Sequence, residues 1–181
     1  MSSEIVIGVT GGIAAYKTAA LVSDLVQSGV GVSVVMTRSA QEFIGAATFR
    51  ALTGRPVATN SFDPEHWPLG PHIELARQAQ MLCVAPATAD FLAKAAHGVA
   101  DDLLSTMWLS FTGTPIVAPA MNCEMWAKPA VQRNVEQLRA DGVTIVDPQE
   151  GWLSCRERGV GRMADPAEIA QAIRAALTAE A

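Results

Sequence analysis

A glycine turn near the N-terminus is the first segment whose residues could bind a ligand. A β-branched run over Ile5 to Val9 leads into Thr10-Gly11-Gly12 and then directly into a helical pattern. At such a junction the free backbone N–H groups and the positive end of the helix converge on one point. Gly11 and Gly12 are therefore expected to bind an anion. A tight turn that binds nothing would use the same glycines, so the turn alone leaves both interpretations open.

The residues around this turn narrow the class of anion. A dinucleotide fingerprint requires Gly-x-Gly-x-x-Gly, which Gly8, Gly11 and Gly12 do not form. Lys17 is similar to the lysine of a nucleoside-triphosphate loop, but the residue before it is not the glycine that such a loop needs. After the second strand, Thr37-Arg38-Ser39 offers hydroxyls and a cation where an NAD enzyme would place an acid. The pattern favours a phosphate monoester, with helix capping by the two hydroxyls as the alternative.

Short β-branched runs alternate with segments of helical spacing, which is typical of parallel strands joined by crossover helices. The strands are continuously apolar, as expected when helices cover both faces of a sheet. We predict strands over 5–9, 30–36, 81–85, 116–118 and 143–146, and helices over 13–27, 40–52, 89–96, 103–109, 124–140 and 166–177. These elements indicate a three-layer α/β/α sandwich with a parallel, Rossmann- or flavodoxin-like sheet in a single domain, residues 1–181. Segments 57–71 and 149–162 fit neither pattern and are expected to be lids or binding loops.

Composition limits the class of partner. Half of the 181 residues are apolar, and 13 basic against 18 acidic residues give a net charge of −5 without a basic tract. This balance favours a small-molecule substrate and argues against nucleic acid or an anionic membrane surface. No apolar run approaches the roughly 20 residues that span a bilayer, and no signal segment is recognised. Three cysteines without metal-ligand spacing indicate a reducing cytoplasm and no metal site.

The most specific motif follows the strand predicted over 116–118. It reads Pro119-Ala120-Met121-Asn122-Cys123-Glu124-Met125-Trp126 and stands at a carboxyl strand edge, where open α/β sheets bind ligands. This segment matches without a gap the Pro-x-Met-Asn-x-x-Met-Trp motif of the flavin-containing cysteine decarboxylases. Segments 8–17, 86–94 and 101–106 are also similar to this family, although the family often has Asn where Asp101 stands. The chain resembles the family over nearly its whole length.

The resemblance implies a cofactor and an assembly. Family members bind FMN and form trimers, sometimes stacked into dodecamers, with the flavin between subunits. A homotrimer or dodecamer with FMN at subunit interfaces is therefore expected. The positions expected to contact FMN are Gly11, Gly12, Thr37, Ser39, Pro86, Thr88, Ala89 and Met121.

Three catalytic positions are also implied by the resemblance. His72 stands where members carry their active-site histidine, and a neutral imidazole can accept a proton near neutral pH. Asn122 can hydrogen-bond the substrate carboxylate, and it can also cap the helix that follows. Residues 149–163 resemble the family's substrate-recognition clamp, whose cysteine would be Cys155. Met125 and Arg162 are further substrate-binding positions. Without the resemblance, His72 would be interpreted as a loop histidine.

The clamp departs from the family pattern at one place. Members usually have Gly-Asp after the cysteine, whereas Arg156-Glu157 stands here. Arginine adopts a positive φ less readily than glycine, so the backbone geometry of this turn is in question. The arginines around Cys155 favour a thiolate and an anionic substrate. Cys83, inside a predicted strand, is expected to be a small buried hydrophobic residue.

The implied activity is FMN-dependent decarboxylation of 4′-phosphopantothenoylcysteine to 4′-phosphopantetheine, a step of coenzyme A biosynthesis. It would proceed by thiol oxidation, loss of CO2 and reduction of the enethiolate. Three alternatives differ in class. A peptidyl-cysteine decarboxylase would share His72 and Asn122 but not the clamp cysteine, and a flavin prenyltransferase would not need Asn122. The third is a non-catalytic flavin-binding regulatory protein of the same fold, which the change at Arg156 keeps open.

Overall fold

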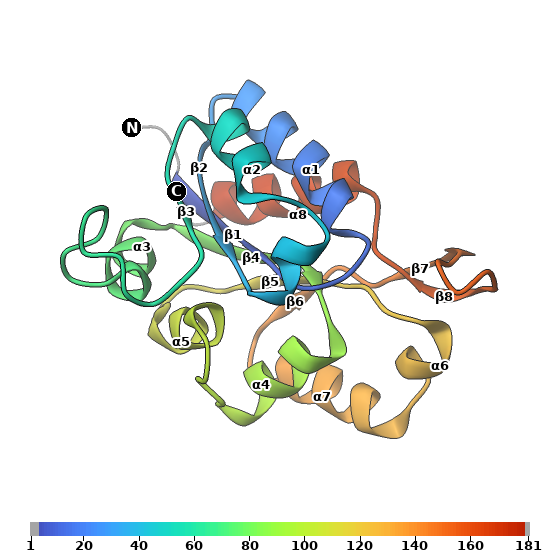
Figure 1. Cartoon of the computed structure of the whole chain (residues 1–181). Helices are drawn as coiled ribbons and strands as arrows, with labels where there is room; N and C mark the ends of the chain where they lie inside the picture. The colour runs from blue at the N-terminus through green and yellow to red at the C-terminus, as the bar shows by residue number, and fades with distance from the viewer. Residues whose placement is uncertain (1–3, 180–181) are drawn as a thin grey trace.

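The computed structural model describes residues 4–179 and contains a six-stranded parallel sheet. The strand order is β3-β2-β1-β4-β5-β6, which is the doubly wound order of a Rossmann fold. Figure 1 shows this sheet between two layers of helices. The strands are β1 (Glu4–Val9), β2 (Gly31–Met36), β3 (Val57–Ala58), β4 (Met81–Ala87), β5 (Ile116–Pro119) and β6 (Thr144–Ile145).

The helices form one hydrophobic core on each face of the sheet. One core contains α1 (Ala15–Gln27), α2 (Ala46–Thr53) and α8 (Pro166–Ala179). The other contains α3 (Pro71–Gln78), α4 (Ala89–His97), α5 (Leu103–Ser110) and α7 (Pro129–Ala140). Every residue of β4 is buried. Successive strand residues point to opposite faces, so Met81, Cys83 and Ala85 belong to the first core and Leu82, Val84 and Ala87 to the second. The predicted three-layer sandwich is confirmed. Within residues 4–179, every helix is too short or too polar to cross a membrane.

Two helices predicted as continuous are interrupted, and both predictions were wrong. Residues 40–52 form a short 3-10 helix, η1 (Ser39–Glu42), and then α2, which begins after an extended Gly45. Residues 124–140 form α6 (Cys123–Trp126) and α7, separated by an extended Lys128. Pro129 opens α7, since proline suits the first helical position and disfavours a helical residue before it. Apolar spacing continues across both breaks and therefore did not reveal them.

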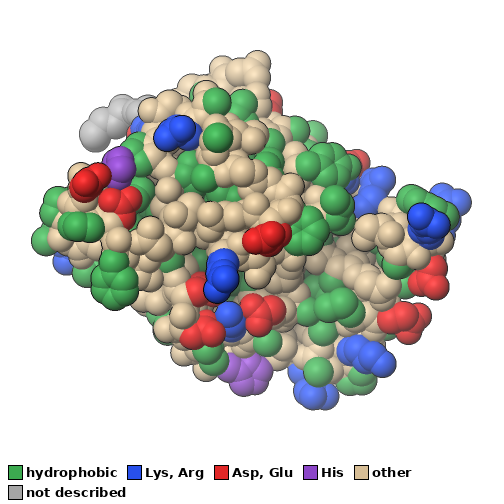
Figure 2. Space-filling view, viewed as in Figure 1, with side chains coloured by type: hydrophobic (Ala, Val, Ile, Leu, Met, Phe, Trp, Pro, Cys, Tyr) green, Lys and Arg blue, Asp and Glu red, His purple; other side chains and the backbone are tan. Residues whose placement is uncertain are grey.

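The two segments that fitted neither pattern contain regular structure. Segment 57–71 holds β3 and a loop into α3, so His72 is the second residue of a helix and not a loop residue. Segment 149–162 is an antiparallel hairpin of β7 (Gln149–Trp152) and β8 (Arg158–Arg162). Figure 1 shows this hairpin projecting from the opposite end of the molecule to α3. Basic and acidic side chains lie together over the hairpin end (Figure 2).

Candidate active site

The carboxyl ends of β1 and β4 are held together by buried hydroxyl groups. The Thr10 hydroxyl donates to the carbonyl oxygen of Pro86 at 2.6 Å and accepts from the backbone N–H of Thr88 at 3.1 Å. Thr18, one turn into α1, donates to the carbonyl oxygen of Ala85 at 2.7 Å. These bonds fix the glycine turn against residues 86–88. The two strands lie where the strand order reverses, which is where doubly wound sheets bind ligands.

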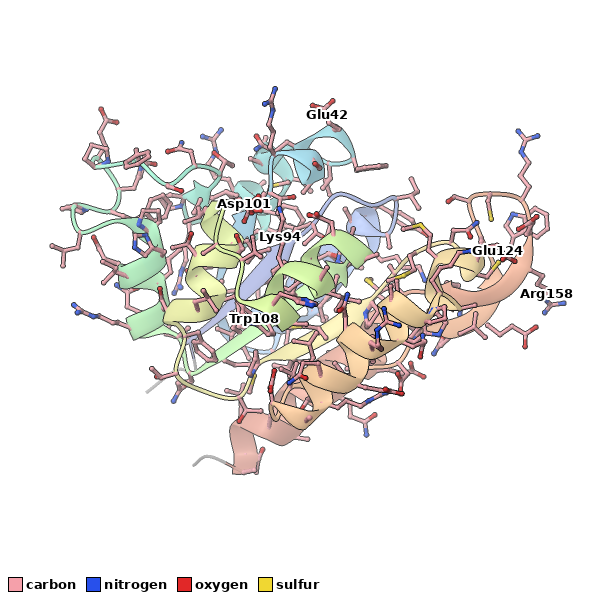
Figure 3. The ribbon with its side chains drawn as sticks, turned by 90° about the horizontal axis from the view of Figure 1, so that it is seen from below. Glu42, Lys94, Asp101, Trp108, Glu124 and Arg158 are labelled. Atoms are coloured by element: carbon pink, nitrogen blue, oxygen red, sulfur yellow. The ribbon has the colours of Figure 1, made fainter. Side chains whose placement is uncertain are left out.

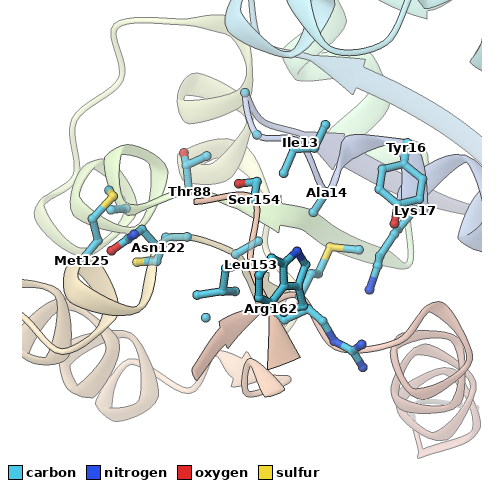
Figure 4. A pocket seen from close by; sticks show the side chains of 18 residues that line it. Ile13, Ala14, Tyr16, Lys17, Thr88, Asn122, Met125, Leu153, Ser154 and Arg162 are labelled. Atoms are coloured by element: carbon cyan, nitrogen blue, oxygen red, sulfur yellow. The ribbon is translucent and has the colours of Figure 1, made fainter. Parts of the chain in front are cut away.

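A cavity of about 490 Å³ opens at this edge, within the range of small-molecule sites. Figure 4 shows its lining, which comes from the glycine turn and α1, the start of α4, the loop after β5, and the hairpin. Eight of the predicted site residues line it: Gly11, Gly12, Thr88, Ala89, Met121, Asn122, Met125 and Arg162. The structure thus brings together segments that are far apart in the sequence.

Asn122 both caps a helix and faces the cavity. Its side-chain carbonyl oxygen accepts from the backbone N–H of Glu124 at 2.7 Å, which confirms the predicted cap of α6. Because the cap uses the oxygen, the amide NH₂ group is the part of the side chain that can donate to a ligand. A neutral donor of this kind is suited to a carboxylate that must later leave.

The hairpin packs directly onto the loop that carries Asn122. The backbone N–H of Met121 donates to the carbonyl oxygen of Gly161 at 3.0 Å. Gly161 has a φ of 154°, and a Cβ atom there would overlap the carbonyl oxygen of Met121. At Gly159 a Cβ atom would lie 2.8 Å from the Cβ of Cys123. Glycine at these positions lets the hairpin backbone approach the backbone of Met121 and the side chain of Cys123 closely, which closes one side of the cavity.

Cys155 lies in the exposed turn of the hairpin and does not line the cavity. Its Sγ is 3.8 Å from Oε2 of Glu157, and the Sγ of Cys123 is 3.9 Å from the same oxygen. Arg156 has a φ of 64°, in the left-handed region that glycine favours. The turn therefore keeps a glycine-like backbone although arginine stands there, at a strain of about 1–2 kcal/mol.

Four other predicted site residues lie outside the cavity lining. His72 lies on α3, a helix that contacts α5, and its Nδ1 is buried without a hydrogen-bond partner within residues 4–179. Thr37 accepts from the backbone N–H of Ala40 at 3.2 Å, so the capping alternative describes its contact in this structure. Ser39 abuts Gly11 so closely that a Cβ atom on the glycine would overlap it. Pro86 contributes its carbonyl oxygen to the bond with Thr10.

The cavity also contains residues that were not predicted as site residues. They include Tyr16 and Lys17 of α1 and Trp152, Leu153 and Ser154 of the hairpin. Lys17 stands one helical turn after the glycine turn, and that spacing was the signal available in the sequence. Because the nucleoside-triphosphate pattern around Lys17 fails, the sequence does not predict a role for it. Cys83, in contrast, is fully buried, and burial raises the pKa of its thiol to about 12, so it is structural as predicted.

Comparison with known proteins agrees with this architecture. The family described as Flavoprotein matches residues 1–178. The chain is 43% identical over 166 residues to the coenzyme A biosynthesis bifunctional protein CoaBC of Bacillus subtilis (strain 168), covering 92% of this chain and 41% of that protein. The chain thus spans about two fifths of the length of the curated relatives it matches.

Two solved structures share the fold over almost all of both chains. The FMN-dependent cysteine decarboxylase SpaF has a TM-score of 0.82 at 35% identity, with 97% of each chain covered. A PPC decarboxylase with a cysteine replaced by serine, complexed with pantothenoylaminoethenethiol, has a TM-score of 0.86 at 29% identity, with 100% of each chain covered. Given the match of the family over residues 1–178, the chain belongs to the Flavoprotein family.

Proposed function

We propose that the protein catalyses FMN-dependent decarboxylation of 4′-phosphopantothenoylcysteine to 4′-phosphopantetheine. One observation carries this proposal: the Gly11-Gly12 turn, the Asn122 loop and the 149–163 clamp all line one cavity. The names of the CoaBC relatives and of the PPC decarboxylase neighbour support this activity and a place for it in coenzyme A biosynthesis. Because the chain matches only part of CoaBC, the proposal concerns this step alone.

The residues present suit FMN. The turn before α1 offers the backbone N–H groups of Gly11 and Ile13, whereas the N–H of Gly12 already donates to the carbonyl oxygen of Thr10. The Cβ atom and backbone of Ser39 adjoin Gly11, which has no room for a side chain. The offered N–H groups fit a terminal phosphate. Ala14, Ala120 and Met121 give the cavity an apolar wall suited to a flavin ring. When bound, FMN would supply the oxidation and reduction that permit CO2 loss from a cysteine carboxylate.

The chain's own residues would bind and protonate the substrate. The Asn122 amide NH₂ would donate to the carboxylate and hold it without a full opposing charge. Cys155 lies outside the cavity lining but directly follows Ser154, which lines it, and from this turn it would donate the proton that completes the saturated thiol. The PPC decarboxylase with a cysteine replaced by serine is complexed with an ethenethiol, the product class expected when such a donor is missing. The three cysteines are free, which fits the reducing cytoplasm that we propose as its location.

The site would be completed by a second copy of the chain. His72 is the expected base, yet it lies outside the cavity of its own chain, on a helix at the opposite end from the hairpin (Figure 1). A neighbouring subunit in a homotrimer or dodecamer would bring its own His72 to this cavity. Ile13, Tyr16, Met125 and Trp152 line the cavity and expose 45–67% of their surface, an apolar area that such a neighbour would cover.

Mass spectrometry of the FMN-loaded protein with 4′-phosphopantothenoylcysteine tests the activity. The expected product has lost CO2 alone. Loss of CO2 together with two hydrogens would indicate an oxidative decarboxylase of the peptidyl-cysteine type, and an unchanged substrate would contradict the proposal.

Mixed oligomers test the shared site. His72→Asn and Cys155→Ser should each fail to form 4′-phosphopantetheine when expressed alone. Co-expressed, they should regain part of the wild-type turnover, because some cavities then combine a wild-type His72 with a wild-type Cys155. No recovery in oligomers shown to contain both variants would place His72 and Cys155 in the same chain's site.

A further inference from the structure

Two cations lie at one end of the cavity around a single carboxylate oxygen. The Nζ of Lys17 is 3.5 Å from Oδ1 of Asp165, and Nη2 of Arg162 is 3.4 Å from the same atom. Lys17 comes from α1 and Arg162 from β8, so two distant segments supply the pair. Figure 4 shows Lys17 and Arg162 on one side of the cavity and Asn122 on the other.

Lys17 is poorly paired for a lysine with so little exposed surface. Its side chain is 17% exposed, and the contact with Asp165 is its one ion pair within residues 4–179. Lys94 is a matched case, with a side chain 19% exposed, but three carboxylates lie 3.0–3.2 Å from its Nζ. Figure 3 shows Lys94 beside Asp101, one of the three. Carboxylates beside the ammonium group stabilise a lysine with so little exposed side chain, and Lys17 has one such neighbour where Lys94 has three.

The Arg162 side chain also retains unused hydrogen-bonding capacity. Its Nη2 donates to Oε1 of Gln149 at 2.8 Å, which fixes the guanidinium at the cavity edge. Its Nε is buried without a hydrogen-bond partner in the part of the chain that the structure describes. Lys17, Arg162 and Asp165 together carry a net positive charge. A phosphate group can bind several such donors at once.

We infer that Lys17 and Arg162 form the binding site for the phosphate group of the substrate. This inference rests on the proposed function. 4′-Phosphopantothenoylcysteine is elongated, with its phosphate at one end and its cysteine carboxylate at the other. With the carboxylate at Asn122, the phosphate reaches toward the opposite side of the cavity, where the two cations lie. Lys17 would then select phosphorylated substrates over unphosphorylated ones.

Substrate pairs that differ only in the phosphate test this role on the FMN-loaded enzyme. Lys17→Met keeps the aliphatic stem and removes the charge. It should lower kcat/KM for 4′-phosphopantothenoylcysteine by about 10- to 100-fold, the range for a lost hydrogen bond between charged groups. Turnover of pantothenoylcysteine should stay within about twofold of wild type on the same physical grounds. Lys17→Arg should restore most of the preference.

Direct binding gives a second readout. The dissociation constant of 4′-phosphopantetheine should rise in Lys17→Met, whereas that of pantetheine should not change. Lys94→Met is the matched control: it should lower the melting temperature without changing the preference for the phosphate.

Three results would overturn the inference. Equal losses for both substrates would make Lys17 a structural residue, and unchanged kinetics would leave it without a role. Loss of FMN from purified Lys17→Met would assign the cations to the phosphate of the cofactor. The proposed function fails differently, because a wild-type enzyme that decarboxylates neither substrate contradicts it whatever Lys17 does.

Discussion

The sheet edge and the hairpin form two sides of the same cavity but are held in place differently. At the sheet edge, hydroxyls of Thr10 and Thr18 bond buried carbonyl groups, and the surrounding strands are buried on both faces. The hairpin is mostly exposed, and Gly161 and Gly159 let it rest closely on the backbone of Met121 and the side chain of Cys123. The comparison indicates a division of roles. A rigid edge suits the binding of a cofactor, whereas a peripheral hairpin suits a group that acts on the substrate once it is bound.

The Asn122 loop lies between these two regions, and changing it should have the largest effect. Asn122→Asp keeps an oxygen that can cap α6 but places a second carboxylate beside that of the substrate. Turnover should fall by about 10³-fold, as when a polar group essential to the reacting centre is lost. Steady-state kinetics would measure the loss, and thermal denaturation should show a melting temperature close to wild type. Turnover near the wild-type rate would remove Asn122 from the site.

Gly161→Ala should displace the hairpin and leave the sheet edge unaltered. The added Cβ atom overlaps the carbonyl oxygen of Met121, and the backbone has a positive φ, so the hairpin must move. Turnover should fall by about 10²-fold, the cost of misplacing reacting groups by roughly 1 Å. FMN content, measured by absorbance, should stay close to wild type because the edge is unaltered. Gly45→Ala is the control, since nothing lies within 4 Å of its Cβ position. Parallel loss of FMN would show that the two regions are not independent.

Thr10→Val, in contrast to the hairpin substitution, alters the sheet edge. Thr10→Val removes the bonds to Pro86 and Thr88 and leaves a buried carbonyl group without its partner. It should cost about 1–3 kcal/mol of unfolding free energy, and FMN affinity should fall with it. Denaturant unfolding and flavin titration would measure both quantities. An unchanged FMN affinity would mean that these hydroxyl bonds do not shape the cofactor site.

The smallest effect is expected at the turn of the hairpin. Arg156→Gly relieves a left-handed backbone at φ 64°, and it should stabilise the folded state by up to about 1 kcal/mol after the greater freedom of glycine in the unfolded chain is counted. Turnover should change little, because the backbone of this turn already has a glycine-like conformation. A large rise in turnover would show that the arginine side chain itself impairs the clamp.

The sequence predicted the sheet better than the hairpin, for a physical reason. Strands buried on both faces are continuously apolar, as β4 is, and that signal does not depend on the rest of the fold. β7 and β8 are short, only Gly151 and Gly161 in them are buried, and they contain charges, so neither a strand nor a helix pattern emerged. The breaks near Gly45 and Lys128 depend on backbone conformations that apolar spacing does not report.

The residues of the candidate site also differ in how far the sequence could predict them. Gly11, Gly12 and Asn122 follow predicted strands, and parallel strands bring their carboxyl ends to one edge, so their meeting could be predicted. Lys17 could not be recognised in this way, because its partner Asp165 lies 148 residues away. The position of His72 relative to the cavity depends on a second copy under the proposed assembly, which no pattern within one chain encodes.

The division of roles is tested most directly by one turnover of FMN-loaded Cys155→Ser without oxygen. If the edge binds and oxidises while the hairpin protonates, this variant should release one equivalent of CO2 per site. It should stop at a product two hydrogens short of 4′-phosphopantetheine, with the visible flavin absorbance bleached. Formation of 4′-phosphopantetheine at the wild-type level, with the flavin absorbance restored, would contradict the role assigned to the hairpin.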